Sequence, residues 1–138
     1  MERSHLYLMF AAKLLGEPVE DDLIDLTGCD LSALKASFLR KDYDEVTRSF
    51  LSRAINEFYE NYGYEAKWEP DHIATMLGFM AHLAKDYSKD SLKIQHRFLS
   101  VHVLPLLRYA EEVCPGLETL RIIITEDLKV VERLLGVG

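Results

Sequence analysis

The chain has 138 residues, of which 49% are hydrophobic, and its formal net charge is −7. This length suits a single domain, residues 1–138, with a substantial core, and the apolar content excludes global disorder. The acidic balance excludes a nucleic-acid-binding protein, because phosphate contacts need a basic surface, and it favours partners that carry positive charge.

The N-terminal segment predicts an amphipathic helix from Arg3 to Leu15, which ends at the Gly-Glu-Pro sequence of residues 16–18. Glu2 stands where a secretion signal would be basic, and Lys13 interrupts an apolar run that is too short to span a bilayer. We therefore expect a cytoplasmic protein without membrane insertion.

The two cysteines, Cys29 and Cys114, have no paired spacing and form no CxxC motif. In a cytosolic protein this predicts two reduced thiols, with neither a disulfide nor a zinc site.

Three further helices are predicted in the first half of the chain. A short acidic helix covers Val19–Leu26 and ends at Gly28; Asp30 caps a helix over residues 31–41; the next begins near Asp44 and ends at Gly63. Residues 17–30 contain six acidic residues and no base: Glu17, Glu20, Asp21, Asp22, Asp25 and Asp30. They form either a solvated acidic face or a docking strip for a basic peptide.

The second half predicts three long helices. Pro70 suits the first position of a central helix that runs to about Tyr87. Its apolar stripe comprises Ile73, Met76, Leu77, Met80, Leu83, Ala84 and Tyr87. A helix over Asp90–Val113 should bend at Pro105, and the last helix covers Leu117–Leu135 despite its strand-like Arg-Ile-Ile-Ile-Thr run. The predicted fold is an all-α single-domain bundle of six or seven helices.

A metal-dependent enzyme is the alternative that the five histidines raise. On one helix, His72 and His82 would lie roughly 15 Å apart along the axis, and His96 and His102 would lie about 120° apart around it, so neither pair shares an ion. A helical hydrolase would have to combine these histidines with Asp71 across several helices. No nucleophile motif or phosphate-binding loop is present.

Around the start of the central helix, several residues admit both a structural and a functional interpretation. Asp71 is favourable in a first helical turn, and His72 lies at the border of the apolar stripe. Trp68 is either a core residue or the aromatic wall of a groove. Gly78, in mid-helix, suits a place where another backbone or a bound peptide comes close.

Three blocks of the sequence resemble the TorD/DmsD/NarJ family of redox-enzyme maturation chaperones, in the order found there. They are "FYENYGYEAK" (58–67), "EPDHIATMLGFMAHL" (69–83) and "FLSVHVLPLL" (98–107). His102 and Pro105 match the last block, whereas Leu106 stands where that family has tryptophan.

The resemblance implies an all-helical TorD-like chaperone that is cytoplasmic and not an enzyme. Such proteins bind the twin-arginine signal peptide, or the N-terminal region, of a molybdenum or iron–sulfur oxidoreductase subunit until its cofactor is inserted. No cofactor of the chaperone itself is expected, and exposed apolar surface makes a homodimer possible. The peptide-binding residues expected from the resemblance are Asp71, His72, Trp68, Glu69, Met76, Phe79 and His102.

Overall fold

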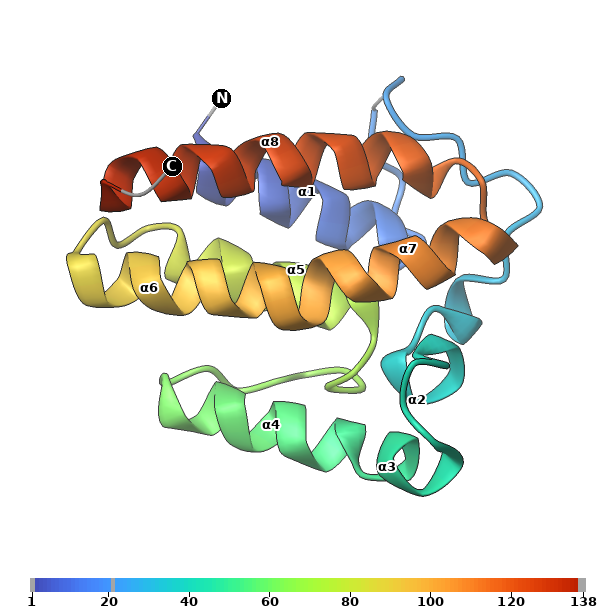
Figure 1. The fold of residues 1–138 in the computed structure, drawn as a ribbon. Coiled ribbons are helices and arrows are strands. Elements are labelled where there is room, and N and C mark those ends of the chain that lie inside the picture. The colour runs from blue at the N-terminus through green and yellow to red at the C-terminus, as the bar shows by residue number, and fades with distance from the viewer. Residues whose placement is uncertain (1, 21, 137–138) are drawn as a thin grey trace.

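The computed structural model describes residues 2–20 and 22–136, which form an all-helical bundle (Figure 1). The helices are α1 (Arg3–Leu14), the 3₁₀-helix η1 (Leu31–Ala33), α2 (Ala36–Leu39), α3 (Glu45–Ser49), α4 (Leu51–Asn61), α5 (Ile73–Leu83), α6 (Lys89–Phe98), the π-helix η2 (Leu99–Val103), α7 (Leu104–Val113) and α8 (Leu117–Leu135). Within those ranges the single β-type pairing is an isolated bridge between Lys35 and His72. The predicted all-α fold class is confirmed.

Helices α1 and α5 pack along one another, while α8 packs against both α6 and α7 (Figure 1). Helix α4 joins this bundle through an aromatic cluster. The Phe58 ring stacks on Phe98 with 5.5 Å between centroids, and Phe98 meets Phe79 edge to face at 4.8 Å. The core therefore extends without interruption from α4 into the main bundle.

The first half of the chain is less regular than the sequence predicts. Val19–Leu26 contains no helix among its described residues, so that prediction is wrong; Asp21 lies outside the described residues. Asp30 does act as a cap, accepting from the Ser32 N–H at 3.2 Å, but the helix expected over 31–41 is divided into η1 and α2. Asp44 caps α3 as expected.

The helix predicted from Asp44 to Gly63 buries only part of its apolar side chains. Leu51, Ile55 and Tyr59 are core residues, whereas Val46 and Phe50 are exposed. The helix is interrupted at Phe50, which ends α3 and begins α4, so the residues before it leave the face that packs on the core.

Helix α5 is shorter than predicted at both ends. Its N-cap is His72, so Pro70 precedes the helix instead of occupying its first position. It ends at Leu83, and Tyr87, expected in the core stripe, is 55% exposed in the following loop. The other predicted stripe residues, from Ile73 to Ala84, are buried.

The helix expected over Asp90–Val113 is a continuous rod in which a π-helical turn precedes Pro105. Proline has no N–H and its ring crowds the carbonyl four residues earlier, which here belongs to Val101. The Val101 oxygen instead accepts from Nη1 of the buried Arg40 at 3.0 Å. At the place where a bend is predicted, the structure has this π-turn, in which one residue is inserted into the helix.

Cys29 and Cys114 form a disulfide, with their Cα atoms 5.4 Å apart, so the prediction of two reduced thiols is wrong. The pairing joins the segment after α1 to the end of α7, across 85 positions of sequence. The same segment touches the start of α8, where a Cβ on Gly116 would lie 1.8 Å from the Asp25 carbonyl oxygen. Only glycine permits this approach.

No helix in the described part of the chain has both the length and the apolar character needed to cross a bilayer.

Candidate functional site

A groove of about 410 Å³ lies between α1, α5 and the loop that joins α4 to α5. We call it the α1–α5 groove. Its lining residues are Ser4, His5, Leu8, Tyr64, Glu65, Lys67, Trp68, Gly78, Ala81, His82 and Lys85. Leu8 is 57% and Trp68 61% exposed, so two large apolar side chains of the groove face solvent. Exposed apolar surface gathered in a concave site is typical of a binding surface.

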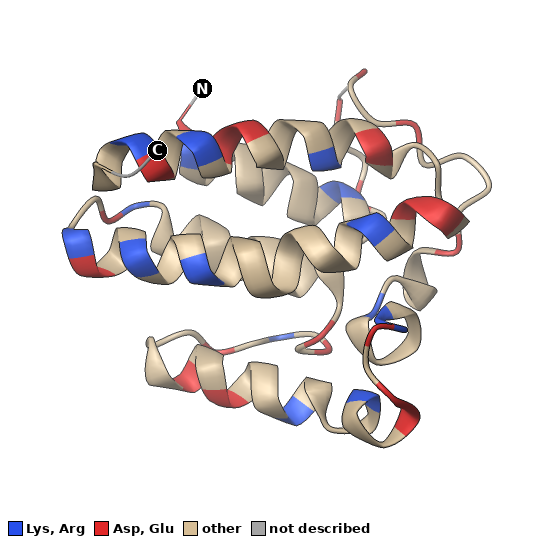
Figure 2. Ribbon diagram, in the orientation of Figure 1, with Lys and Arg blue, Asp and Glu red and all other residues tan. Residues whose placement is uncertain are grey.

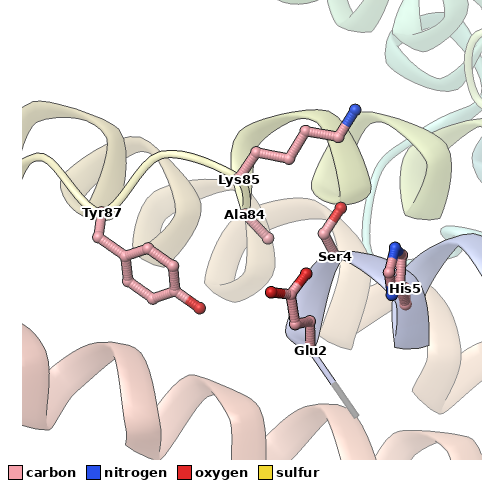
Figure 3. Close-up of a pocket in the computed structure, with 6 residues that line it drawn as sticks. All are labelled: Glu2, Ser4, His5, Ala84, Lys85 and Tyr87. Atoms are coloured by element: carbon pink, nitrogen blue, oxygen red, sulfur yellow. The ribbon is translucent and has the colours of Figure 1, made fainter.

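Two further hollows extend the groove at its ends, because they share lining residues with it. One, of about 250 Å³, shares Ser4, His5 and Lys85 and adds Glu2 and Tyr87 (Figure 3). In Figure 3 the Glu2 carboxylate and the Tyr87 hydroxyl face each other across this hollow.

The second hollow, of about 330 Å³, lies at the α4 end of the groove. It shares Tyr64 and Glu65 with the groove and adds Asn56 and Glu60. Together the three hollows form a connected surface on α1, α4, α5 and the loop between α4 and α5, which suits a peptide better than one small ligand.

The floor of the α1–α5 groove is shaped by Gly78 and Tyr64. A Cβ on Gly78 would lie 2.7 Å from the Tyr64 hydroxyl oxygen, so the glycine allows the tyrosine to lie across α5. The expected close approach at Gly78 is therefore made by a tyrosine side chain. Burial raises the pKa of the Tyr64 hydroxyl above its ordinary value, which is already well above neutral pH, so the group is a hydrogen-bond donor.

Charges are distributed unevenly around the groove. Glu60 and Glu65 lie at the α4 end, whereas Lys67 lines the groove itself and Lys85 lies at its opposite end. Figure 2 shows the Asp and Glu positions on α4, the helix at this end of the groove. The α4 end can therefore hold a cationic group beside the apolar Trp68 wall.

Asp71 and His72 are buried, at 2% and 8% exposure, and their polar groups bind within the protein. Asp71 Oδ2 accepts from the Ser37 N–H at 2.8 Å. His72 Nδ1 accepts from the Ala74 N–H at 3.0 Å, so its Nε2 carries the proton and donates to the Leu31 carbonyl at 2.6 Å. In this conformation the pair fastens residues 31–37 to the start of α5.

The other expected site residues are dispersed. Glu69 is exposed and pairs with Lys35 at 3.0 Å, close in sequence to Trp68. Met76 and Phe79 are fully buried in α5. His102 lies in η2 on the far side of the aromatic cluster, with its ring 5.2 Å from that of Phe98.

His102 has a strongly perturbed acid–base equilibrium. Burial, followed by the positive charges of Arg40 and Arg97, lowers its pKa to about 4. The ring is therefore neutral at physiological pH.

The described residues bring together no group of three or more His, Cys, Asp or Glu side chains able to hold a metal ion. The histidines proposed for a hydrolase therefore do not meet. His82 lines the α1–α5 groove, whereas His96 lines a separate hollow beside Leu135.

Sequence reasoning missed Leu8, Tyr64 and Glu65 as site residues. Leu8 comes from α1, and only the packing of α1 on α5 brings it opposite Trp68. A usable signal was the cluster of aromatic and charged residues between Gly63 and Trp68, in a loop where such side chains usually serve binding.

Comparison with protein families decides the affiliation. The sequence matches the family model described as "Nitrate reductase delta subunit" over residues 43–112, half of the chain. The chain belongs to the nitrate reductase delta subunit family. This family consists of assembly chaperones for molybdoenzymes, whose partner is the catalytic subunit during its maturation.

The range matched by the family model, residues 43–112, begins just before α3 and ends one residue before the end of α7. It includes Trp68, Glu65 and Glu60, and also Asp71 and His72. The α1 wall of the groove lies outside it.

Proposed function

We propose that this chain is a cytoplasmic assembly chaperone, acting as a single domain, for the molybdenum- or iron–sulfur-containing subunit of an oxidoreductase. It binds the signal peptide or N-terminal region of that subunit and releases it after the cofactor has been inserted. The chaperone needs no cofactor and performs no catalysis in this role. The family affiliation supports the class of client, and the α1–α5 groove supports the peptide.

The observation that carries the proposal is the pairing of exposed apolar side chains with carboxylates at one end of the groove. Leu8 and Trp68 offer an apolar surface, and Glu60 and Glu65 lie beyond Tyr64. A twin-arginine signal peptide has the matching order, because two guanidinium groups precede an apolar stretch. Arginine binds carboxylates in bidentate geometry, and the apolar stretch would cover Trp68.

The carboxylates at the α4 end are exposed, so their main contribution is to specificity and association rate. The apolar contacts at Trp68 provide more of the affinity, because large aromatic side chains dominate binding energies in such sites. Glu69 borders this surface. Asp71 and His72 become part of it only if residues 31–37 move away.

Calorimetric titration with signal peptides of molybdoenzyme subunits from the same genome tests the proposal. We expect saturable binding of one peptide and weaker binding of its Lys-Lys variant, since lysine cannot make the bidentate contact. Light scattering on the same samples shows whether a homodimer forms and whether peptide dissociates it. If no peptide binds to the folded protein, the proposed peptide site is wrong.

Variants locate the site. Trp68→Ala should weaken binding about tenfold or more, whereas Phe50→Ala, an equally exposed aromatic residue outside the groove, should not. Glu60→Gln should weaken binding of the Arg-Arg peptide more than of the Lys-Lys peptide. Glu57→Gln is its matched control, because Glu57 is exposed on the same helix but lines none of the three hollows.

A further inference from the structure

Residues 30–37, here called the strap, cross the start of α5 and cover Asp71 and His72. Two backbone hydrogen bonds hold the strap there, in addition to its bonds to the two side chains. The Ala36 N–H donates to the Asp71 carbonyl at 3.0 Å, and the Ile73 N–H donates to the Leu34 carbonyl at 3.0 Å. The pairing is an isolated antiparallel bridge between Lys35 and His72, in the short extended stretch of the strap between η1 and α2.

On either side of Lys35 the strap presents an apolar side chain. Leu34 and Ala36 are buried against the bundle, while Lys35 between them points to Glu69 and remains partly accessible. Backbone groups and alternate apolar side chains are what any extended peptide can provide. The site beneath the strap is therefore suited to a second occupant of the same chemistry.

The strap is fastened at both ends by interactions that are distant in sequence. At its N-terminal end, Cys29 is bonded to Cys114 at the end of α7. At its C-terminal end, Arg40 donates to the Val101 carbonyl in η2 and is paired with Asp42. The chain before the strap, from Leu15 to Cys29, contains no helix in its described residues, so once Cys29 is released it is held by side-chain packing, chiefly that of Ile24, and not by a helical hydrogen-bond ladder.

We propose that the strap occupies, within the protein itself, the site at Asp71 and His72 that an extended client segment can take, and that the Cys29–Cys114 disulfide locks it there. A dithiol reductant supplies two electrons and two protons, breaks the S–S bond to give two thiols, and leaves as its own disulfide. The freed strap then opens, and the client segment pairs with the backbone at Asp71 and Ile73. The identity of the client rests on the proposed function; the lock does not.

Hydrogen exchange of the intact protein, oxidised and after treatment with a dithiol, tests the lock without any client. We expect amides of the strap and of Ile73 to exchange about tenfold faster or more after reduction, with α8 unchanged. The Cys29→Ser/Cys114→Ser variant should exchange like the reduced protein. Equal exchange in both states overturns the proposal, as does an equal rise in α8, which would indicate general loosening.

A synthetic peptide of residues 30–39 then tests the second occupant, with a scrambled peptide as the control. We expect it to bind the reduced protein at least about tenfold more tightly than the oxidised protein, because only the reduced strap vacates the site. Equal affinities for the two states overturn the proposal. If this peptide binds but no signal peptide does, the site beneath the strap is supported and the proposed client is wrong. If signal peptides bind equally to the oxidised and the reduced protein, the proposed client is supported and the lock is wrong.

Discussion

At the scale of single residues, the Asp71 side chain acts as an acceptor for a backbone N–H of the strap. Loss of this side chain leaves the part-buried Ser37 N–H without its carboxylate acceptor. We expect Asp71→Ala to lower the free energy of unfolding by roughly 1–3 kcal/mol. Urea denaturation followed by circular dichroism measures the change.

The matched control for Asp71→Ala is Glu69→Ala, two positions earlier. Glu69 is exposed and pairs with Lys35, so its removal should cost less than about 1 kcal/mol. If the two variants have equal stability, Asp71 does not hold the strap. If Asp71→Ala retains native stability and still loses peptide binding, Asp71 contacts the client directly in the resting conformation.

His102 predicts a pH dependence of stability. Its pKa is about 4 in the folded protein, against about 6.5 when unfolded, because burial and two arginines disfavour the cation. Between these values the unfolded chain binds more protons, so stability falls as the pH is lowered from about 7 to about 4. The contribution lost is about 3 kcal/mol for a shift of this size.

Denaturation of the His102→Phe variant between pH 4 and 7 checks this. The phenyl ring preserves the aromatic contact with Phe98 and cannot be protonated, so the stability of the variant should depend less steeply on pH. Ser100→Ala, an exposed neighbour in η2, should keep the parent profile. A His102→Phe profile as steep as the parent's would contradict the prediction.

At the scale of elements, Gly78 in α5 can be replaced without loss of stability only if Tyr64 is changed. A Cβ at position 78 would lie 2.7 Å from the Tyr64 hydroxyl oxygen but 3.8 Å from the ring carbon behind it. We expect Gly78→Ala to destabilise the parent protein by about 1 kcal/mol, because the new methyl group meets the Tyr64 hydroxyl. In the Tyr64→Phe background this contact is absent, so the higher helix propensity of alanine should stabilise the protein by up to about 1 kcal/mol. A double-mutant cycle by urea denaturation measures both, and the same sign in both backgrounds would contradict it.

The sequence predicted those elements whose signals are local. Helix α8 has its apolar repeat throughout its length, and Leu117–Leu135 was predicted with the observed bounds. Gly63, with φ +72°, ends α4 as expected, since only glycine adopts this backbone angle easily. The helix predicted at 19–26 was wrong because the segment contains no base that could pair with its acidic residues at helical spacing, and because Ile24 reaches the core without a helix.

The remaining features depend on contacts between distant segments and had no local signal. The Cys29–Cys114 pairing spans 85 positions. The strap over His72 is set by backbone hydrogen bonds that any residue could make. Within the candidate site, the sequence predicted that Trp68 lies just before the central helix. The position of Leu8 on the opposite wall could not be predicted, because it depends on how α1 packs on α5.

At the scale of the whole molecule, one buried network joins the N-terminal helix to the C-terminal half. Arg3 in α1 donates from Nε and Nη2 to the two carboxylate oxygens of Asp127 in α8, at 2.6 and 3.0 Å. Arg3 Nη2 also donates to Gln95 in α6 at 2.7 Å, and the Tyr7 hydroxyl donates to Asp127. Burial and the Asp127 charge raise the pKa of Tyr7, so it remains a donor. The network fixes α1, and therefore the Leu8 wall of the groove.

Asp127→Ala should lower the free energy of unfolding by about 3–5 kcal/mol, because it leaves the Arg3 charge buried without its partner. Glu126→Ala, which removes the exposed pair with Lys129, should cost less than about 1 kcal/mol. Urea denaturation measures both. Replacing both partners, as Arg3→Met with Asp127→Leu, should recover most of the loss, since no charge is then buried. If the double variant is no more stable than Asp127→Ala, then packing at Asp127, and not the ion pair, holds α1. In that case the affinity for peptide should decline equally in Asp127→Ala and in the double variant.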